Sequence, residues 1–195
     1  MNEMSTRLTW ITLFVVIAVL VFSPVVSADD ESGKKNDRKG WLHGLHVGAT
    51  HPLGSLNDFQ DSNVHFRMNA GYAFSEKLSV MAYVGFSQFT SDRPSGDLNY
   101  YWFNASLNVK VVLITTSTGV SYFFQGGPGL YVPKSHSDIP LDTTLGFNAG
   151  IGAQVPIHWP FFIEWGMYYH HTNISKSEQP KYGFLTFHLG VIYIW

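Results

Sequence analysis

The chain has 195 residues, of which 45% are hydrophobic, 16% aromatic and 13% charged. A soluble domain normally carries about 25% charged residues, so this composition suits a protein that meets both water and a less polar phase. The net charge of −2 argues against nucleic-acid binding, and the lack of cysteine excludes disulfides, thiolate catalysis and cysteine metal sites.

Residues 1–28 have the features of a secretory signal peptide. Arg7 gives a basic start, residues 11–22 are almost entirely apolar, and Val26-Ser27-Ala28 forms a small-residue cleavage site. The apolar run is shorter than the roughly 20 residues of a spanning helix, although an uncleaved N-terminal anchor is the alternative. We expect cleavage after Ala28, followed by a polar periplasmic tail over 29–39.

From residue 40 onward, apolar residues alternate with polar or small ones. Strands place successive side chains on opposite faces, so a spanning barrel strand should alternate in this way over about 9–11 residues. Residues 64–74 show the pattern best, with Phe66, Met68 and Tyr72 on one face and Arg67 and Asn69 on the other. Eight segments are compatible with it: 41–50, 64–74, 78–89, 102–111, 118–132, 145–155, 161–170 and 182–195.

The connections between these segments alternate in length. Short ones lie near residues 75–77, 115–117 and 158–159, and longer ones cover 51–63, 90–99, 133–141 and 172–181. Short periplasmic turns and long extracellular loops are typical of outer-membrane barrels, so we expect both termini on the periplasmic side. Gln88 breaks the alternation and is expected at the rim, and Gly126-Gly127-Pro128-Gly129 indicates a bend or the upper end of its strand.

The polar faces carry the charged residues of the predicted strands. Arg67, Lys110 and Glu164 all fall on that face, whereas Arg or Lys on the lipid face would cost about 2–4 kcal/mol at mid-bilayer. An eight-stranded lumen is just wide enough for side chains, so we predict a packed polar plug in which Glu164 pairs with Arg67 or Lys110; a proton- or ion-conducting path is the alternative. The predicted lumen network comprises Arg67, Lys110, Glu164, His65, Asn69, Asn104, Asn108, Asn148 and Gln154, with His46, His170 and His188 on the same face.

The chain ends in a strand whose alternate residues are apolar up to the last position. These are Phe187, Leu189, Val191, Tyr193 and Trp195. The pattern resembles the C-terminal assembly signal of Gram-negative outer-membrane barrels, in which the last residue is usually Phe. An ordinary hydrophobic strand that ends the chain is the alternative.

The mature segment as a whole resembles the outer-membrane β-barrel domain family of small OmpA- and OprF-like barrels. The resemblance rests on residues 71–79 (GYAFSEKLS), 126–131 (GGPGLY) and 145–152 (LGFNAGIG). It implies an all-β fold over residues 40–195, a transmembrane antiparallel up-and-down β-barrel of about eight strands. It also implies an integral outer-membrane protein with a structural, envelope or loop-mediated interaction role. We expect a monomer among outer-membrane lipid and lipopolysaccharide, assembled by periplasmic chaperones and the barrel-assembly machinery.

Other functions are weaker alternatives. A narrow porin-like conduit comes second, and a lipid A 3-O-deacylase comes third, because residues 170–173 (HHTN) followed by Glu178 loosely resemble the C-terminal region of those enzymes. Thr172 stands where their nucleophilic serine is needed, so we predict no catalytic residues. The adjacent His170 and His171 point to opposite faces of a strand and chelate poorly, so we predict no metal or cofactor. A soluble barrel is the structural alternative, and in it the apolar faces of the strands would point inward and the polar faces outward.

Overall fold

The computed structural model describes residues 39–54, 61–90, 100–135, 143–172 and 182–195. The predicted signal peptide over 1–28 and the tail as far as residue 38 lie outside the described residues. The described residues form eight strands: β1 (Gly40–Leu53), β2 (Asn63–Ala73), β3 (Leu78–Phe89), β4 (Tyr100–Thr115), β5 (Ser121–Ser135), β6 (Thr144–His158), β7 (Phe161–Thr172) and β8 (Gly183–Ile194).

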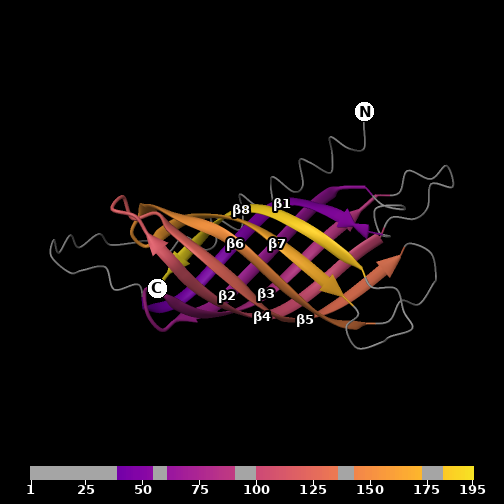
Figure 1. Ribbon diagram of the computed structural model, residues 1–195, viewed down its shortest axis with the longest axis horizontal. Coiled ribbons are helices and arrows are strands. Elements are labelled where there is room, and N and C mark those ends of the chain that lie inside the picture. The colour runs from indigo at the N-terminus through magenta and orange to yellow at the C-terminus, as the bar shows by residue number, and fades with distance from the viewer. Residues whose placement is uncertain (1–38, 55–60, 91–99, 136–142, 173–181) are drawn as a thin grey trace. The chain divides into compact units, whose positions relative to one another are not determined.

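The strands form a closed barrel in which each strand pairs antiparallel with its neighbours in the chain (Figure 1). β8 completes the circle by pairing with β1. The strands have 11 to 16 residues, which exceeds the length needed to cross a bilayer as a tilted strand. The predicted all-β, eight-stranded, up-and-down barrel is therefore confirmed.

No helix among the described residues is long and apolar enough to cross a membrane.

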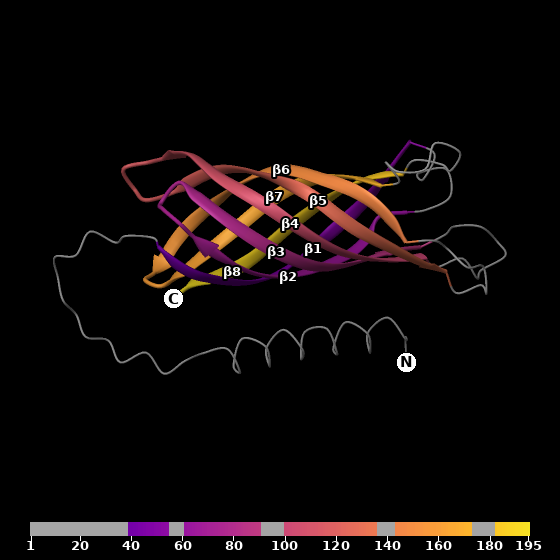
Figure 2. The same ribbon diagram turned by 90° about the horizontal axis from the view of Figure 1, so that it is seen from below.

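The two ends of the barrel differ in the length of their connections. Residues 74–77, 116–120 and 159–160 join strands at one end, where the C-terminus also lies (Figure 2). We call this the short-turn end. The connections over 54–62, 90–99, 136–143 and 173–182 join strands at the opposite, long-connection end. The alternation of lengths is as predicted, with the longer strands taking residues that the sequence assigned to loops.

The outward face of the barrel is apolar. Along β7 the side chains alternate between exposed and buried, and Trp165 on the outward face is 47% exposed. Leu107 and Leu189 on other strands are 57% and 56% exposed. A closed antiparallel barrel with such a face is suited to contact with acyl chains.

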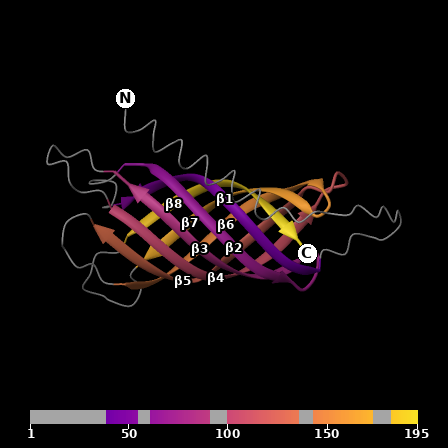
Figure 3. The same cartoon turned by 180° about the vertical axis from the view of Figure 1, so that it is seen from behind.

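Trp195 extends the β1–β8 pairing that closes the barrel beyond the end of β8. The Trp41 N–H donates to the Trp195 carbonyl at 2.9 Å, and the Trp195 N–H donates back to the Trp41 carbonyl at 2.8 Å. Figure 3 shows β8 reaching this end of the barrel from behind. The chain terminus is thus part of the sheet, in register with β1.

β5 differs from the prediction. Of the two alternatives for Gly126–Gly129, a bend or the upper end of the strand, the second is wrong, because β5 continues through this run to Ser135. The β4–β5 register pairs Val109 with Gly126 and Ser106 with Gly129, and Pro128 between them has no N–H to give to the ladder. Because β4 and β6 pair on both sides of β5, the strand persists although its local sequence favours a break.

Candidate functional site

All nine residues of the predicted lumen network are buried inside the barrel. Asn69, the most exposed of them, is 7% exposed, and Glu164 is fully buried. Their strands bring them together because every second residue of each strand faces the interior of the closed sheet. His46, His170 and His188 are buried on the same side.

Glu164 on β7 receives most of the charged contacts. The Lys110 ammonium on β4 donates to its Oε2 atom, and Gln154 on β6 donates to the same oxygen at 2.9 Å. Its Oε1 atom lies 3.2 Å from His46 Nε2 and 3.7 Å from Arg67 Nη2. Glu164 thus pairs with both predicted cations, and Lys110 is the closer of them.

Arg67 on β2 is held between two aromatic rings. Its guanidinium carbon lies 4.1 Å from the Tyr83 ring centroid and 4.4 Å from that of Tyr168. Both tyrosine hydroxyls donate to Gln125 Oε1, at 2.7 and 3.2 Å. These two rings give the buried cation electrostatic support beyond its carboxylate partner.

The remaining polar side chains form pairs nearer the long-connection end. Asn108 and Asn148 exchange amide hydrogen bonds at 2.6 and 3.2 Å. His65 Nδ1 contacts Ser87 Oγ at 2.9 Å, and His170 contacts Tyr131 Oη and Thr186 Oγ1, each at 3.1 Å. Asn104 lies over Gly85 of the neighbouring strand.

Inward glycines leave space for the largest rings. A Cβ on Gly190 would stand 2.3 Å from His46 Cδ2, and one on Gly150 would stand 2.6 Å from Tyr168 Cγ. His46 and Tyr168 are the direct cross-strand partners of these glycines. The narrow lumen holds such rings only because the facing position has no side chain.

Sequence reasoning missed two apolar clusters that lie inside the barrel on either side of the polar residues. The short-turn plug consists of Leu42, Ala73, Met81, Tyr83, Phe162, Ile192 and Ile194. The long-connection plug consists of Phe89, Trp102, Tyr131 and Phe184, with Tyr182 packed against it.

The inward residues of β8 show how apolar and polar layers follow one another along the lumen. Its inward positions begin with Phe184 of the long-connection plug, continue with Thr186 and His188, and end with Ile192 and Ile194 of the short-turn plug. The polar residues therefore lie between two apolar layers. The alternation placed Trp102 and Phe162 on the inward face, but it gave no sign that such residues gather at the two ends.

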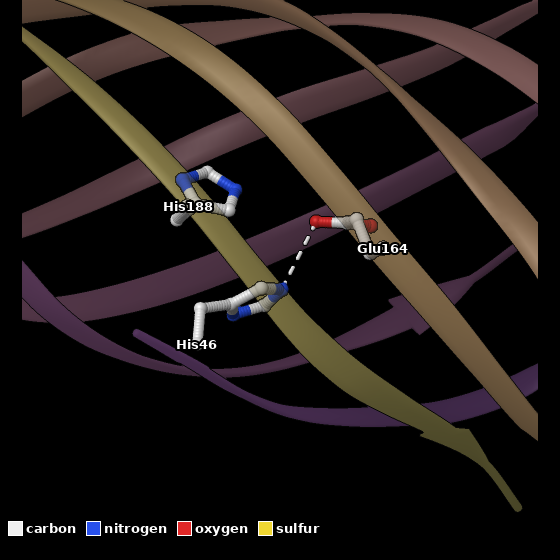
Figure 4. Close-up of side chains that lie close together, drawn as sticks. All are labelled: His46, Glu164 and His188. Atoms are coloured by element: carbon white, nitrogen blue, oxygen red, sulfur yellow. Dashed lines mark ion pairs between the residues drawn. The ribbon is translucent and has the colours of Figure 1, made fainter. Parts of the chain in front are cut away.

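Three inward residues lie close enough together to suggest a metal site. One ligand atom from each of His46 on β1, Glu164 on β7 and His188 on β8 lies within 4.8 Å of the others, and Figure 4 shows the three side chains close together. Glu164 is already bound by Lys110 and lies beside Arg67. A divalent cation would add charge next to two buried cations, so this arrangement opposes metal binding.

The residues that resemble a deacylase site are engaged in other contacts. His170 faces the interior and contacts Tyr131 and Thr186, while Thr172 Oγ1 donates to the Tyr182 carbonyl at 3.3 Å. A nucleophile needs its base within hydrogen-bond reach, and these contacts hold the two groups to different partners. Residues 173 and 178 lie outside the described part of the chain.

A family model for the outer membrane protein beta-barrel domain matches residues 14–194. The chain belongs to this family. Its resemblance to small outer-membrane barrels is thereby confirmed, and membership supports a location in the outer membrane. No curated protein matches the sequence.

Several solved barrels have the same fold at low sequence identity. Neisserial surface protein A matches with a TM-score of 0.58 and 17% identity, over 80% of this chain and 96% of its own. The N-terminal barrel of OprF from Pseudomonas aeruginosa matches with a TM-score of 0.55 and 12% identity, over 80% and 98%. Ail of Yersinia pestis, solved in complex with the heparin analogue sucrose octasulfate, matches with a TM-score of 0.51 and 17% identity, over 80% and 98%.

Proposed function

We propose that this protein is a sealed outer-membrane barrel whose role is structural or interactive, exercised through its four long connections. The observation that supports this most is the pair of apolar plugs at the two ends of the lumen. Phe89 and Phe184 in one plug and Met81 and Ile192 in the other are fully buried. An ion crossing these layers would lose its hydration without receiving polar ligands, which is very costly.

The partners in this proposal follow from the location. Outer-membrane lipid and lipopolysaccharide surround the apolar outer face, and a monomer suffices because closure leaves no free strand edge.

Export with cleavage after Ala28 would precede assembly by periplasmic chaperones and the barrel-assembly machinery. Phe187, Leu189, Val191, Tyr193 and Trp195 would form the assembly signal, and the first three are 40–56% exposed on the outward face. The complex of Ail with a heparin analogue is a precedent for ligand binding by a barrel of this fold.

A narrow conduit is the second candidate, favoured by the polar layer between the plugs. Single-channel recording in planar bilayers separates the two functions. We expect the wild-type protein to give no steady conductance steps, and steady steps would overturn the sealed-barrel proposal.

Variants of the two plugs test in the same recording which plug blocks conduction. Phe89→Ala with Phe184→Ala opens one plug, and Met81→Ala with Ile192→Ala opens the other. We expect either pair alone to remain closed and the combined variant to conduct, because the two plugs act in series. Conductance from one pair equal to that of the combined variant would show that the other plug is no barrier.

A further inference from the structure

Four of the histidines form a continuous row of rings inside the barrel. The ring centroid of His188 on β8 lies 4.8 Å from that of His46 on β1 and 6.5 Å from that of His65 on β2. The His65 ring in turn lies 6.4 Å from the ring of His170 on β7. All four side chains are buried. Because histidine changes its charge more readily than other side chains between pH 5 and 8, the charge of this row can depend on pH.

Arg67 requires the neutral form of His188. Arg67 Nη2 lies 3.1 Å from His188 Nε2, and a guanidinium can only donate, so Nε2 accepts with its lone pair. A proton on Nε2 would place two cationic donors against each other. The Glu164 carboxylate lies within 4.8 Å of His188, but Lys110 already donates to it. The closed barrel therefore holds His188 uncharged.

The same reasoning applies to two further histidines of the row. In the described part of the chain, the hydrogen-bond partners of His65 and His170 are hydroxyl groups rather than carboxylates. His65 and Arg67 are alternate residues on the inward face of β2, and His170 lies beside His65. A proton on either ring would add positive charge next to a cation or to the other histidine. His46 differs, because its Nε2 lies 3.2 Å from Glu164 Oε1, where a charge would be paired.

The histidine row is in direct contact with the long-connection plug. The rings of His170 and Phe184 are stacked, with centroids 4.5 Å apart and planes 6° apart. His170 Nδ1 also lies 3.1 Å from the Tyr131 hydroxyl. Phe184 and Tyr131 both belong to this plug. Hydration of His170 would therefore deprive the plug of a stacked ring and a hydrogen-bond partner.

Arg67 connects the same row to the short-turn plug. Its guanidinium carbon lies 4.1 Å from the ring centroid of Tyr83, which belongs to that plug. The Tyr83 hydroxyl also donates to Met81 Sδ in the same plug at 3.1 Å. When His188 no longer accepts a hydrogen bond from Arg67, the guanidinium is released, and Tyr83 loses the cation that it packs against.

We propose that the barrel is an acid-responsive gate, closed at neutral pH and opened when His65, His170 and His188 take up protons. This inference rests on the sealed barrel proposed above. In the closed barrel the three rings are buried and uncharged, whereas in an open, hydrated lumen each gains a proton below about pH 6.5. The open state then binds more protons, so the closed state loses stability as the pH falls. Each proton taken up raises the ratio of open to closed barrels by up to about tenfold per pH unit.

Single-channel recording over a series of pH values tests the gate. We expect the wild-type protein to give no conductance steps near pH 7 and steady steps between about pH 5 and pH 3, with an open fraction that rises more than about tenfold per pH unit. Heat-modifiable gel mobility at each pH shows whether the barrel is still folded.

The outcomes of this recording separate the gate from the sealed barrel. A folded barrel that stays closed throughout the series would overturn the gate and leave the sealed barrel standing. Unfolding in acid without earlier conductance would overturn the gate as well. Steady steps near pH 7 would overturn the sealed barrel itself, and the gate with it.

Glutamine variants identify the groups that respond. Glutamine does not titrate, and its amide oxygen can accept the hydrogen bond from Arg67. We expect the combined variant His65→Gln, His170→Gln and His188→Gln to remain closed over the whole series. Each single variant should reduce the steepness of opening by about one proton. A purely structural role of a histidine would shift the pH of opening without changing this steepness.

His158→Gln is the matched control, because His158 is exposed at the short-turn end and should leave the pH response intact. The single variants decide the assignment if the combined variant does not fold. Unchanged steepness in all three single variants would contradict the proposal. So would a loss of the acid response in His158→Gln.

Discussion

At the scale of single residues, Glu164 supplies negative charge that compensates the buried cations of the lumen. Its two oxygens face Lys110, Arg67, His46 and Gln154. A buried ion pair adds little net stability compared with apolar residues of similar volume, but removal of one partner leaves the other charge buried and unpaired. The main contribution of the Glu164 carboxylate is therefore that it keeps the buried cations from being left unpaired. Its net attraction to them adds little stability.

The substitution Glu164→Gln tests this role. We expect it to lower the free energy of unfolding by about 3–5 kcal/mol, measured by urea unfolding in lipid vesicles with tryptophan fluorescence. Adding Lys110→Met should recover part of the loss, because one of the stranded cations is then removed.

Glu76→Gln is the control for that measurement, because Glu76 is exposed in the turn between β2 and β3. It should leave the urea midpoint unchanged. If Glu164→Gln unfolds at the same urea concentration as the control, the buried carboxylate does not hold the cations in place.

At the scale of one element, β8 carries both faces of the barrel and also closes it. Its outward residues include Phe187 and Leu189, and its inward residues include His188 and Ile192. Trp195 extends its pairing by two backbone hydrogen bonds to Trp41. Trp195 therefore adds two backbone hydrogen bonds to the β1–β8 pairing that closes the barrel.

Deletion of Trp195 should reduce the fraction of folded protein in the outer membrane. It removes both hydrogen bonds, each contributing about 0.5–1.5 kcal/mol, together with an aromatic ring at the interface. Heat-modifiable gel mobility of the membrane fraction measures the outcome. Trp195→Phe keeps the backbone pairing and should fold normally, and equal folded fractions for the deletion and the wild type would contradict a role of this residue in closure.

At the scale of the whole molecule, the eight strands were predictable because the outward and inward faces of each strand have different surroundings. The residues along each strand therefore alternate between apolar and polar or small. Alternation reports which face a residue occupies, so the inward positions of Arg67, Lys110 and Glu164 could be predicted as well. It does not report the height of a residue along the barrel, and the gathering of Phe89 and Phe184 into a plug was therefore missed.

The aromatic support of Arg67 was also beyond the sequence. Tyr83 and Tyr168 come from β3 and β7, which are far apart in the chain and meet only across the closed lumen. The path of β5 through Gly126–Gly129 has a similar cause, because pairing on both sides overrides the local preference for a break. Both features depend on closure of the barrel, which no single segment specifies.

In the function we propose, the outward face of the barrel meets lipid while the polar interior is sealed. Because the chain has no cysteine, single cysteines can report the accessibility of each face by labelling in lipid vesicles. We expect Ser87→Cys, which is inward and fully buried below the long-connection plug, to be unreactive toward a charged thiol reagent until the protein is unfolded. Ala105→Cys, which is outward on β4, should react with a lipid-soluble reagent only. Rapid modification of Ser87→Cys by the charged reagent in the folded protein would contradict the sealed, lipid-facing barrel.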